Sequence, residues 1–140
     1  MAKQAGGCQC GEVRYELQGE PLTLYACHCT NCQTRTGSAC SLLLVASASD
    51  VRVTRGEVES PPYSDKKKWC AACGTTLWKD TNGILRMPFG TFDDTRWATP
   101  AAHIWTRSAQ PWVTIREGAH VYETQPEDLM ELLTAWKERR

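Results

Sequence analysis

The sequence predicts a mainly β fold with one short α-helix near its C-terminal end. Three observations lead to this prediction. Several short segments alternate polar and apolar residues with the two-residue period of a half-buried strand, turn residues separate these segments, and a clear helical period occurs only near the end of the chain. A chain of 140 residues has the size of one ordinary domain, so we expect a single domain over residues 1–140.

The first half of the chain is expected to form strands joined by tight turns. Its expected strands are residues 12–17, 22–25, 40–45 and 51–54. Gly19 to Pro21 turn the chain between the first two of them, and residues 30–37 are polar enough for a turn or a short helix. The run at 40–45 is apolar apart from Ser41, which predicts a strand buried on both faces.

The second half combines short strands with an exposed loop. Residues 60–68 contain Pro61, Pro62 and three consecutive lysines, a composition that is typical of a loop. The expected strands that follow are residues 75–78, 84–89 and 112–115.

The helix is expected over residues 127–138. Its apolar face consists of Leu129, Met130, Leu132, Leu133 and Trp136. Thr124 is the expected N-cap, Glu127 completes a capping box with it, and Pro126 suits the first turn.

Charge and hydropathy narrow the expected partners. Sixteen basic and sixteen acidic residues leave no net charge, so nothing favours binding to a nucleic-acid backbone or to an anionic membrane surface. The first residues, MAKQAGGCQC, contain no apolar run, and no long apolar segment follows. We therefore expect a cytoplasmic protein. In that reducing compartment, closely spaced cysteines indicate metal ligands, with disulfides as the alternative.

The eight cysteines form three clusters and one isolated residue. The clusters are Cys8-x-Cys10, Cys27-x-Cys29-x-x-Cys32 and Cys70-x-x-Cys73, and the isolated residue is Cys40. A tight turn between two cysteines points both sulfurs at one ion, and zinc binds tetrahedral sets of thiolates. Gly11 and Gly74 follow the first and third clusters and allow such turns. These two clusters together supply four ligands, which predicts a closed, structural zinc site.

The middle cluster offers only three thiolates. A zinc ion bound by Cys27, Cys29 and Cys32 keeps one coordination position for a further ligand, and it readily accepts and deprotonates a thiol. This predicts sulfur chemistry at an open site. The alternative is a second structural zinc, closed by His28, Cys40 or a distant histidine.

Other residues near the clusters have weaker assignments. His28 lies between two ligands, so we expect its ring to point away from the metal and to serve in packing or hydrogen bonding. His103 and His120 are expected to be ordinary, partly buried residues, and Cys40 an inert core thiol. Trp105 is a candidate wall of the open site, although packing in the core explains most tryptophans equally well. The lysines at 66–68 are expected to be solvated, and they can attract a carboxylate-bearing substrate.

Four segments taken together carry a family resemblance. They read GGCQCGEVRYEL, CHCTNCQTRTGSA, WCAACGTTLW and AAHIWTRSAQPW, in this order along the chain. In this order they resemble the glutathione-dependent formaldehyde-activating enzyme family, which also includes centromere protein V. The resemblance runs from Gly6 to about Tyr122.

The resemblance implies a fold, two metal ions and an activity. The implied fold is a β-tent of packed antiparallel sheets with zinc-binding loops. The implied zinc ligands are Cys8, Cys10, Cys70 and Cys73 at a structural ion and Cys27, Cys29 and Cys32 at a catalytic ion, which makes two ions per chain. The implied activity condenses formaldehyde with the co-substrate glutathione to S-hydroxymethylglutathione, and its reverse is that of a carbon–sulfur lyase. The implied partners are thus a small-molecule thiol and an aldehyde.

The hypothesis for the reaction is that the glutathione sulfur, held and deprotonated at the open site, attacks the carbonyl carbon of formaldehyde. His28 is the nearest candidate acid or base, and solvent is the alternative. Two other functions stay open at this point. One is a non-catalytic zinc-stabilised module that binds a macromolecule, and the other is a zinc-thiolate metal buffer or redox sensor.

Overall fold

The computed structural model describes residues 2–139 and divides the chain into two compact units. The first unit comprises the chain up to Pro21 together with Leu44–Trp97, and the second comprises Leu22–Leu43 and the chain from Ala98 onward. The chain goes from the second unit to the first within strand β4 (Ser41–Ser47), between Leu43 and Leu44. The expectation of one domain over residues 1–140 stays a prediction.

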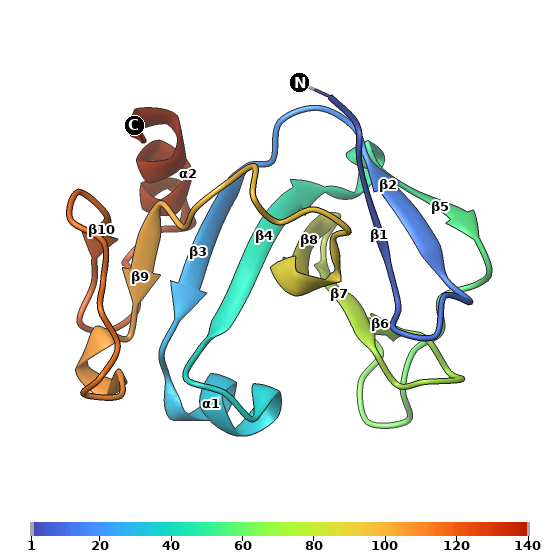
Figure 1. Cartoon of the computed structure of the whole chain (residues 1–140), viewed down its shortest axis with the longest axis horizontal. Helices are drawn as coiled ribbons and strands as arrows, with labels where there is room; N and C mark the ends of the chain where they lie inside the picture. The colour runs from blue at the N-terminus through green and yellow to red at the C-terminus, as the bar shows by residue number, and fades with distance from the viewer. Residues whose placement is uncertain (1, 140) are drawn as a thin grey trace. The chain divides into compact units, whose positions relative to one another are not determined.

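The first unit contains a three-stranded antiparallel sheet (Figure 1). Its strands are β1 (Gln4–Gly7), β2 (Arg14–Leu17) and β5 (Val51–Arg55), with β2 in the middle. Tyr15 and Leu17 of β2 are fully buried, while Arg14 and Glu16 between them are partly exposed. This alternation is the one predicted from the sequence, because successive side chains of a strand point to opposite faces.

The same unit contains the antiparallel strands β6 (Lys67–Trp69), β7 (Thr76–Thr81) and β8 (Ile84–Pro88). The turn between β7 and β8 is made by Asn82 and Gly83, which both have positive φ as a two-residue hairpin turn requires. The buried ring of Tyr15 contacts the edges of Trp78 and Phe92 at centroid distances of 5.9 and 5.3 Å. Aromatic side chains therefore form much of this unit's core.

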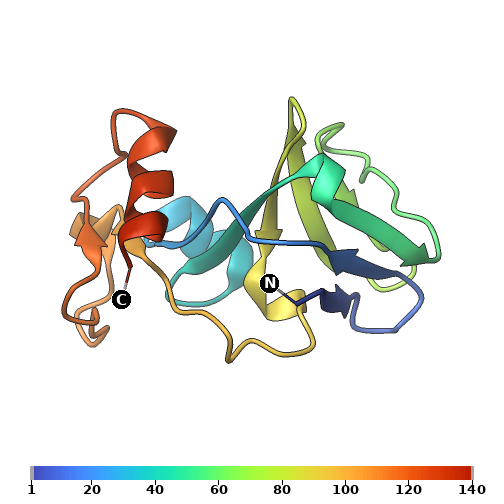
Figure 2. The ribbon, with the colours of Figure 1, turned by 90° about the horizontal axis from the view of Figure 1, so that it is seen from above.

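Parallel strands form the second unit's part of the other sheet. β3 (Thr23–Cys27) pairs with β9 (Ala102–Ile104), and β9 pairs with β10 (His120–Val121). The helix α1 (Thr30–Thr36) follows β3 directly, and it ends at Gly37, which has a φ of 64°. The helix α2 (Leu129–Glu138) contacts β3 and β9 (Figures 1 and 2).

The start of α2 differs from the prediction. Asp128, not Thr124, is the N-cap: its side chain accepts a hydrogen bond from the Met130 N–H at 2.9 Å, and Glu131 completes the capping box. The carbonyl of Thr124 instead accepts a hydrogen bond from the Trp105 N–H at 3.2 Å, and Thr124 lies in a bend before the helix. Met130, expected on the apolar face, is 56% exposed.

Two strand predictions need correction. Residues 112–115 form no strand, because a turn closed by the Val113 N–H and the Gln110 carbonyl at 3.0 Å starts this segment. In β4, Leu44, Val45 and Ala46 are buried as expected, but Leu42 is 39% exposed. The strands β1, β6, β9 and β10 were not predicted. Lys67 and Lys68 lie in β6 and are only partly exposed, so the loop expected over residues 60–68 ends earlier. Three short 3-10 helices also occur at Ala48–Asp50, Phe89–Thr91 and Thr106–Ser108.

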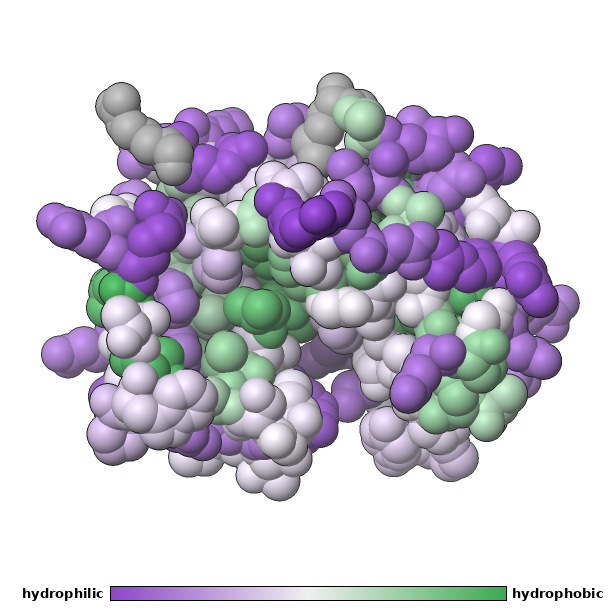
Figure 3. Space-filling view, in the orientation of Figure 1, coloured by the Kyte–Doolittle hydropathy of each residue, from purple (hydrophilic) through white to green (hydrophobic). Residues whose placement is uncertain are grey.

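The predicted fold class is confirmed. Residues 2–139 contain ten strands in two sheets and a short C-terminal helix, so the fold is mainly β. On the face drawn in Figure 3, hydrophilic side chains cover β1 and β2, and apolar side chains gather around β3 and β9. Within the described residues, neither helix has the length and apolar character needed to cross a membrane.

Candidate metal centres

Four cysteine sulfurs meet in the first unit. Cys8 and Cys10 lie between β1 and β2, Cys70 and Cys73 lie between β6 and β7, and all four sulfurs are within 4.8 Å of one another. The sulfur of Cys10 is 3.6 Å from that of Cys8 and 3.7 Å from that of Cys70. Zinc–sulfur bonds of about 2.3 Å in a tetrahedron separate the sulfurs by about 3.8 Å, so this group fits zinc.

Each of the two turns that carry these sulfurs is closed by the N–H of a glycine. The N–H of Gly11 donates to the Cys8 carbonyl at 3.2 Å, and the N–H of Gly74 donates to the Cys70 carbonyl at 2.8 Å. Both glycines have positive φ, 83° and 77°, where a side chain would be strained. The Val13 N–H also donates to the Cys8 sulfur at 3.2 Å. Each turn therefore points its sulfurs inward, as the two glycines led us to expect.

Thr75 connects the two turns, and the sequence analysis missed it. Its hydroxyl oxygen lies 3.1 Å from the Cys73 sulfur and accepts a hydrogen bond from the Gln9 N–H at 3.2 Å. Hydrogen bonds from the side chain and backbone of Thr75 lower the pKa of Cys73 to about 5. A threonine two residues after the last cysteine was the only available indication.

Three sulfurs meet in the second unit. Cys27 ends β3, Cys29 is the N-cap of α1, and Cys32 lies in the first turn of α1. Their sulfurs lie within 4.8 Å of one another, and no other His, Cys, Asp or Glu between residues 2 and 139 belongs to the group. Cys27 and Cys32 are buried, while Cys29 is partly exposed. Three soft donors with one accessible member suit a zinc ion that keeps a position for another ligand.

The surroundings of the three sulfurs are partly cationic. The Arg35 guanidinium donates to the Cys32 sulfur at 3.4 Å, and the Cys32 N–H donates to the Cys29 sulfur at 3.3 Å. Burial raises the pKa of Cys27 and also that of Cys32. Burial acts in the same direction on Cys29, but the Cys32 N–H and the neighbouring thiols lower its pKa overall. Ionising all three thiols together therefore requires a bound cation.

His28 stands apart from the sulfurs and pairs with another histidine. Its ring is buried, and its Nε2 lies 2.9 Å from Nδ1 of His103. Burial lowers the pKa of both rings. The pKa of His103 falls to about 4, because electrostatic repulsion by the nearby His28 adds to the effect of burial. The ring of His28 thus has the hydrogen-bonding role that the sequence analysis favoured.

Two proposed closing ligands are not in this group. His28 is engaged with His103, and Cys40 belongs to neither group of sulfurs. Cys40 is only half-buried, although burial still raises its pKa. His120, expected to be partly buried, is exposed.

All eight cysteines are free thiols in the described structure. The sulfur separation of 3.6 Å between Cys8 and Cys10 is far beyond a disulfide bond of about 2.05 Å. The disulfide alternative is therefore not the one that the structure adopts.

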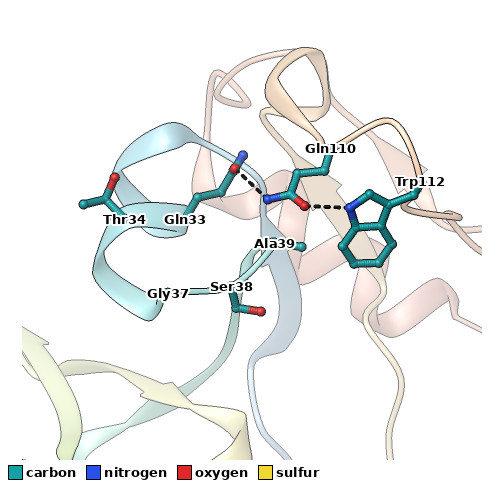
Figure 4. A pocket seen from close by; sticks show the side chains of 7 residues that line it. All are labelled: Gln33, Thr34, Gly37, Ser38, Ala39, Gln110 and Trp112. Carbon is teal, nitrogen blue, oxygen red and sulfur yellow. Dashed lines mark hydrogen bonds between the residues drawn. The ribbon is translucent and has the colours of Figure 1, made fainter.

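A shallow pocket lies beside α1 in the second unit (Figure 4). It has a volume of about 510 Å³ and is lined by Gln33, Thr34, Gly37, Ser38, Ala39, Gln110 and Trp112. Trp105 is not among the residues that line this pocket: its Nε1–H donates to Gln125 at 3.1 Å, and Arg107 lies over the ring. The expectation that Trp105 forms a wall of the open site stays a prediction. The pocket residues and Arg35 lie in two of the segments that carry the family resemblance, CHCTNCQTRTGSA and AAHIWTRSAQPW, but the sequence analysis assigned no role to any of them.

Comparison with known proteins identifies the family of the chain. A protein-family model described as glutathione-dependent formaldehyde-activating enzyme matches residues 3–108. No curated protein matches the chain significantly. Among solved structures, a crystal structure of a Rhodobacter sphaeroides protein is 19% identical with a TM-score of 0.46, and the match covers 84% of this chain and 98% of that chain. Because the family model spans more than half of the sequence, the chain belongs to the glutathione-dependent formaldehyde-activating enzyme family.

Proposed function

We propose that the protein is a zinc-dependent carbon–sulfur lyase or synthase that joins a small thiol to an aldehyde. Glutathione and formaldehyde are the leading pair, because the family is described by them. The observation that carries the proposal is the difference between the two sulfur groups: one gathers four donors and the other only three. The first suits a structural ion, and the second suits an ion that takes substrate.

Cys27, Cys29 and Cys32 would hold the ion of the second site. When bound there, zinc supplies a position for the substrate sulfur and favours its ionised form. The partial exposure of Cys29, between two buried cysteines, indicates the side from which a substrate approaches.

The proposed reaction is an addition without net oxidation or reduction. The thiol loses its proton, the sulfur forms a bond to the carbonyl carbon of formaldehyde, and the carbon–oxygen double bond becomes a single bond. The oxygen gains a proton, which gives S-hydroxymethylglutathione. The reverse reaction breaks the same carbon–sulfur bond and releases thiol and aldehyde.

Residues around the second site contribute a positive charge near the sulfurs and hold the sulfur-bearing loop in place. Arg35, which donates to the Cys32 sulfur at 3.4 Å, offsets the negative charge of three thiolates. The backbone of His28 is fixed on both sides: its N–H donates to the Ile104 carbonyl at 3.0 Å, and its carbonyl accepts from Gln33 at 2.8 Å. These bonds hold the loop between Cys27 and Cys29. The ring of His28 is engaged with His103, so we assign the proton transfers to solvent.

The test is Cys29→Ser, with Cys40→Ser as the matched control. We expect the Cys29 variant to fold, to retain about one zinc per chain in place of two, and to lose turnover of S-hydroxymethylglutathione measured by NMR. The Cys40 variant should retain both ions and full activity. A folded Cys29 variant with one zinc and unchanged turnover would refute the catalytic assignment. A parent protein with two zinc ions and no turnover of any thiol–aldehyde adduct would instead favour a binding module.

A further inference from the structure

Trp112 is the most exposed of the large apolar side chains described between residues 2 and 139. Its side chain is 72% exposed, yet its Nε1–H donates to Oε1 of Gln110 at 2.7 Å. This short hydrogen bond fixes the direction of the indole at the edge of the pocket (Figure 4). A large ring that is both exposed and held in place is a typical feature of a binding surface.

The hydrogen bond belongs to a chain of amides with a single possible direction. An indole N–H only donates, so Gln110 must turn its oxygen toward Trp112 and its nitrogen toward Gln33. Gln110 Nε2 donates to Oε1 of Gln33 at 3.2 Å. Gln33 Nε2 therefore faces two backbone carbonyls, those of His28 at 2.8 Å and Ser108 at 2.9 Å. The orientation of Trp112 is thus coupled to the loop that carries Cys27 and Cys29.

The lining of the pocket is polar but uncharged. It combines side-chain amides from Gln33 and Gln110 and hydroxyls from Thr34 and Ser38 with one aromatic ring. No Asp, Glu, Lys, Arg or His is among the seven residues that line it. A site of this composition suits a neutral polar group, because no opposite charge is available to replace the hydration of an ionised one.

The side-chain amide of Gln110 can form further hydrogen bonds with a neutral group. A glutamine amide has two donor positions and two acceptor positions, and the described contacts of Gln110 use one of each. The remaining donor and acceptor match the C=O and N–H of a peptide group. The planar peptide group also suits the open face of the neighbouring indole.

We propose that this pocket binds a peptide group of the thiol substrate, with the Trp112 ring against it and Gln110 hydrogen-bonded to it. The proposal rests on the proposed function, since it places the body of a peptide-like thiol beside the three sulfurs. Gln33 directly follows Cys32, so their Cα atoms are about 3.8 Å apart. A tripeptide spans up to about 10 Å, so a thiol of this size can extend from the sulfur group along neighbouring residues of α1. Its charged ends lie in solvent.

The binding test uses S-methylglutathione, in which the sulfur is blocked. The indole Nε1–H of Trp112 is assigned in the NMR spectrum of the zinc-loaded ¹⁵N-labelled protein as the signal that Trp112→Phe removes. We expect S-methylglutathione to shift this signal in a saturable way. S-methylcysteine, which has the same thioether but no peptide bond, should not shift it. An unmoved signal at high millimolar S-methylglutathione, or equal shifts with both compounds, would overturn the proposal.

Kinetics provide a second measurement. Trp112→Ala and Gln110→Leu should each raise the KM for glutathione about tenfold, with kcat changed less than about threefold. The rate with 2-mercaptoethanol, which has no peptide group, should stay the same. Tyr63→Ala is the matched control, because it removes another exposed aromatic ring, 66% exposed in the first unit, and should leave all three values unchanged.

The two proposals fail separately. A saturable shift of the Trp112 signal without any thiol–aldehyde turnover would support the pocket and refute the reaction. Turnover of glutathione with an unchanged KM in both pocket variants would support the reaction and refute the pocket.

Discussion

Nε2 of His28 lies 2.9 Å from Nδ1 of His103, with the two ring planes 21° apart. The pair joins the loop of the three sulfurs to the middle residue of β9. Burial is the main reason that both rings have a lowered pKa, so both are neutral near pH 7. In a neutral pair one ring donates and the other accepts. Nδ1 of His28 has no partner among the described residues, which favours His28 Nε2 as the donor, since an unpaired acceptor costs less than an unpaired donor.

The pair predicts a dependence of stability on pH. The pKa of His103 is about 4 in the folded protein against 6.5 for the ordinary group, so the unfolded chain binds more protons between these values. The free energy of unfolding should therefore fall as the pH falls from about 6.5 toward 4. His103→Gln should make this decline shallower in denaturant titrations at several pH values. His120→Gln removes an exposed histidine and should keep the parent's slope; equal slopes in all three proteins would contradict the prediction.

The four-sulfur group should be required for folding. Cys70 is buried and its sulfur is 3.7 Å from that of Cys10, so Cys70→Ser removes one of the four ligands from a closed site. We expect this variant to lose one zinc ion and to unfold at a much lower temperature, because the binding energy of structural zinc contributes to folding. Zinc content and thermal unfolding measure both effects. A Cys70→Ser protein with the parent's melting temperature would show that the group is not structural.

Arg35 should strengthen metal retention at the three-sulfur group. Removing its hydrogen bond to the Cys32 sulfur with Arg35→Gln is expected to weaken zinc binding at this site about tenfold, as changes beside metal ligands typically do. Competition with a chelator measures the effect. Arg52→Gln is the control, because that arginine is exposed and paired with Glu16 in the first unit. Equal zinc retention in both variants would exclude this role.

Gln33 should contribute to stability through its side-chain nitrogen. Gln33→Glu replaces the donor that serves the carbonyls of His28 and Ser108 with a carboxylate oxygen. Two partly buried acceptors lose their partner, and we expect a loss of about 2–4 kcal/mol in the free energy of unfolding. Urea titration compares this variant with Gln18→Glu, which makes the same chemical change at an exposed position. A loss no larger than that of the control would mean that the clamp is unimportant.

Local patterns predicted much of the fold. The alternation around Tyr15 and Leu17 predicted β2, and the polar segment before Gly37 predicted a turn or a short helix, of which the structure has the helix α1. Both predictions depend only on residues that are close together in the sequence. The pattern at 112–115 was equally strand-like but gave the wrong structure, because Pro111 lies in the turn closed by Gln110 and Val113. A strand also needs a partner, which a local pattern does not reveal.

The N-cap of α2 is another feature that a local sequence pattern does not determine. Thr124 with Glu127 and Asp128 with Glu131 have the same spacing, and sequence alone does not rank them. The tertiary structure selects the second pair. The N–H groups of Trp105, Thr106 and Arg107 donate to the carbonyls of Thr124, Tyr122 and Glu123, respectively, so these residues are held outside the helix and the helix begins later.

The sequence by itself determined the mainly β class and the local cysteine clusters, because closely spaced cysteines meet through short turns that depend only on their neighbours. The meeting of the first and third clusters, 60 residues apart at Cys10 and Cys70, was predicted from the number of ligands that zinc needs and not from a local pattern. The tertiary structure alone decided what surrounds them. Parallel pairing places Ala26 opposite His103 and Cys27 opposite Ile104, and this register brings His28 to its histidine partner. The hydrogen bonds of Gln33 to the segment at 108–110 likewise join residues about 75 positions apart. Contacts over such separations follow from strand register and from packing, which short-range patterns do not encode.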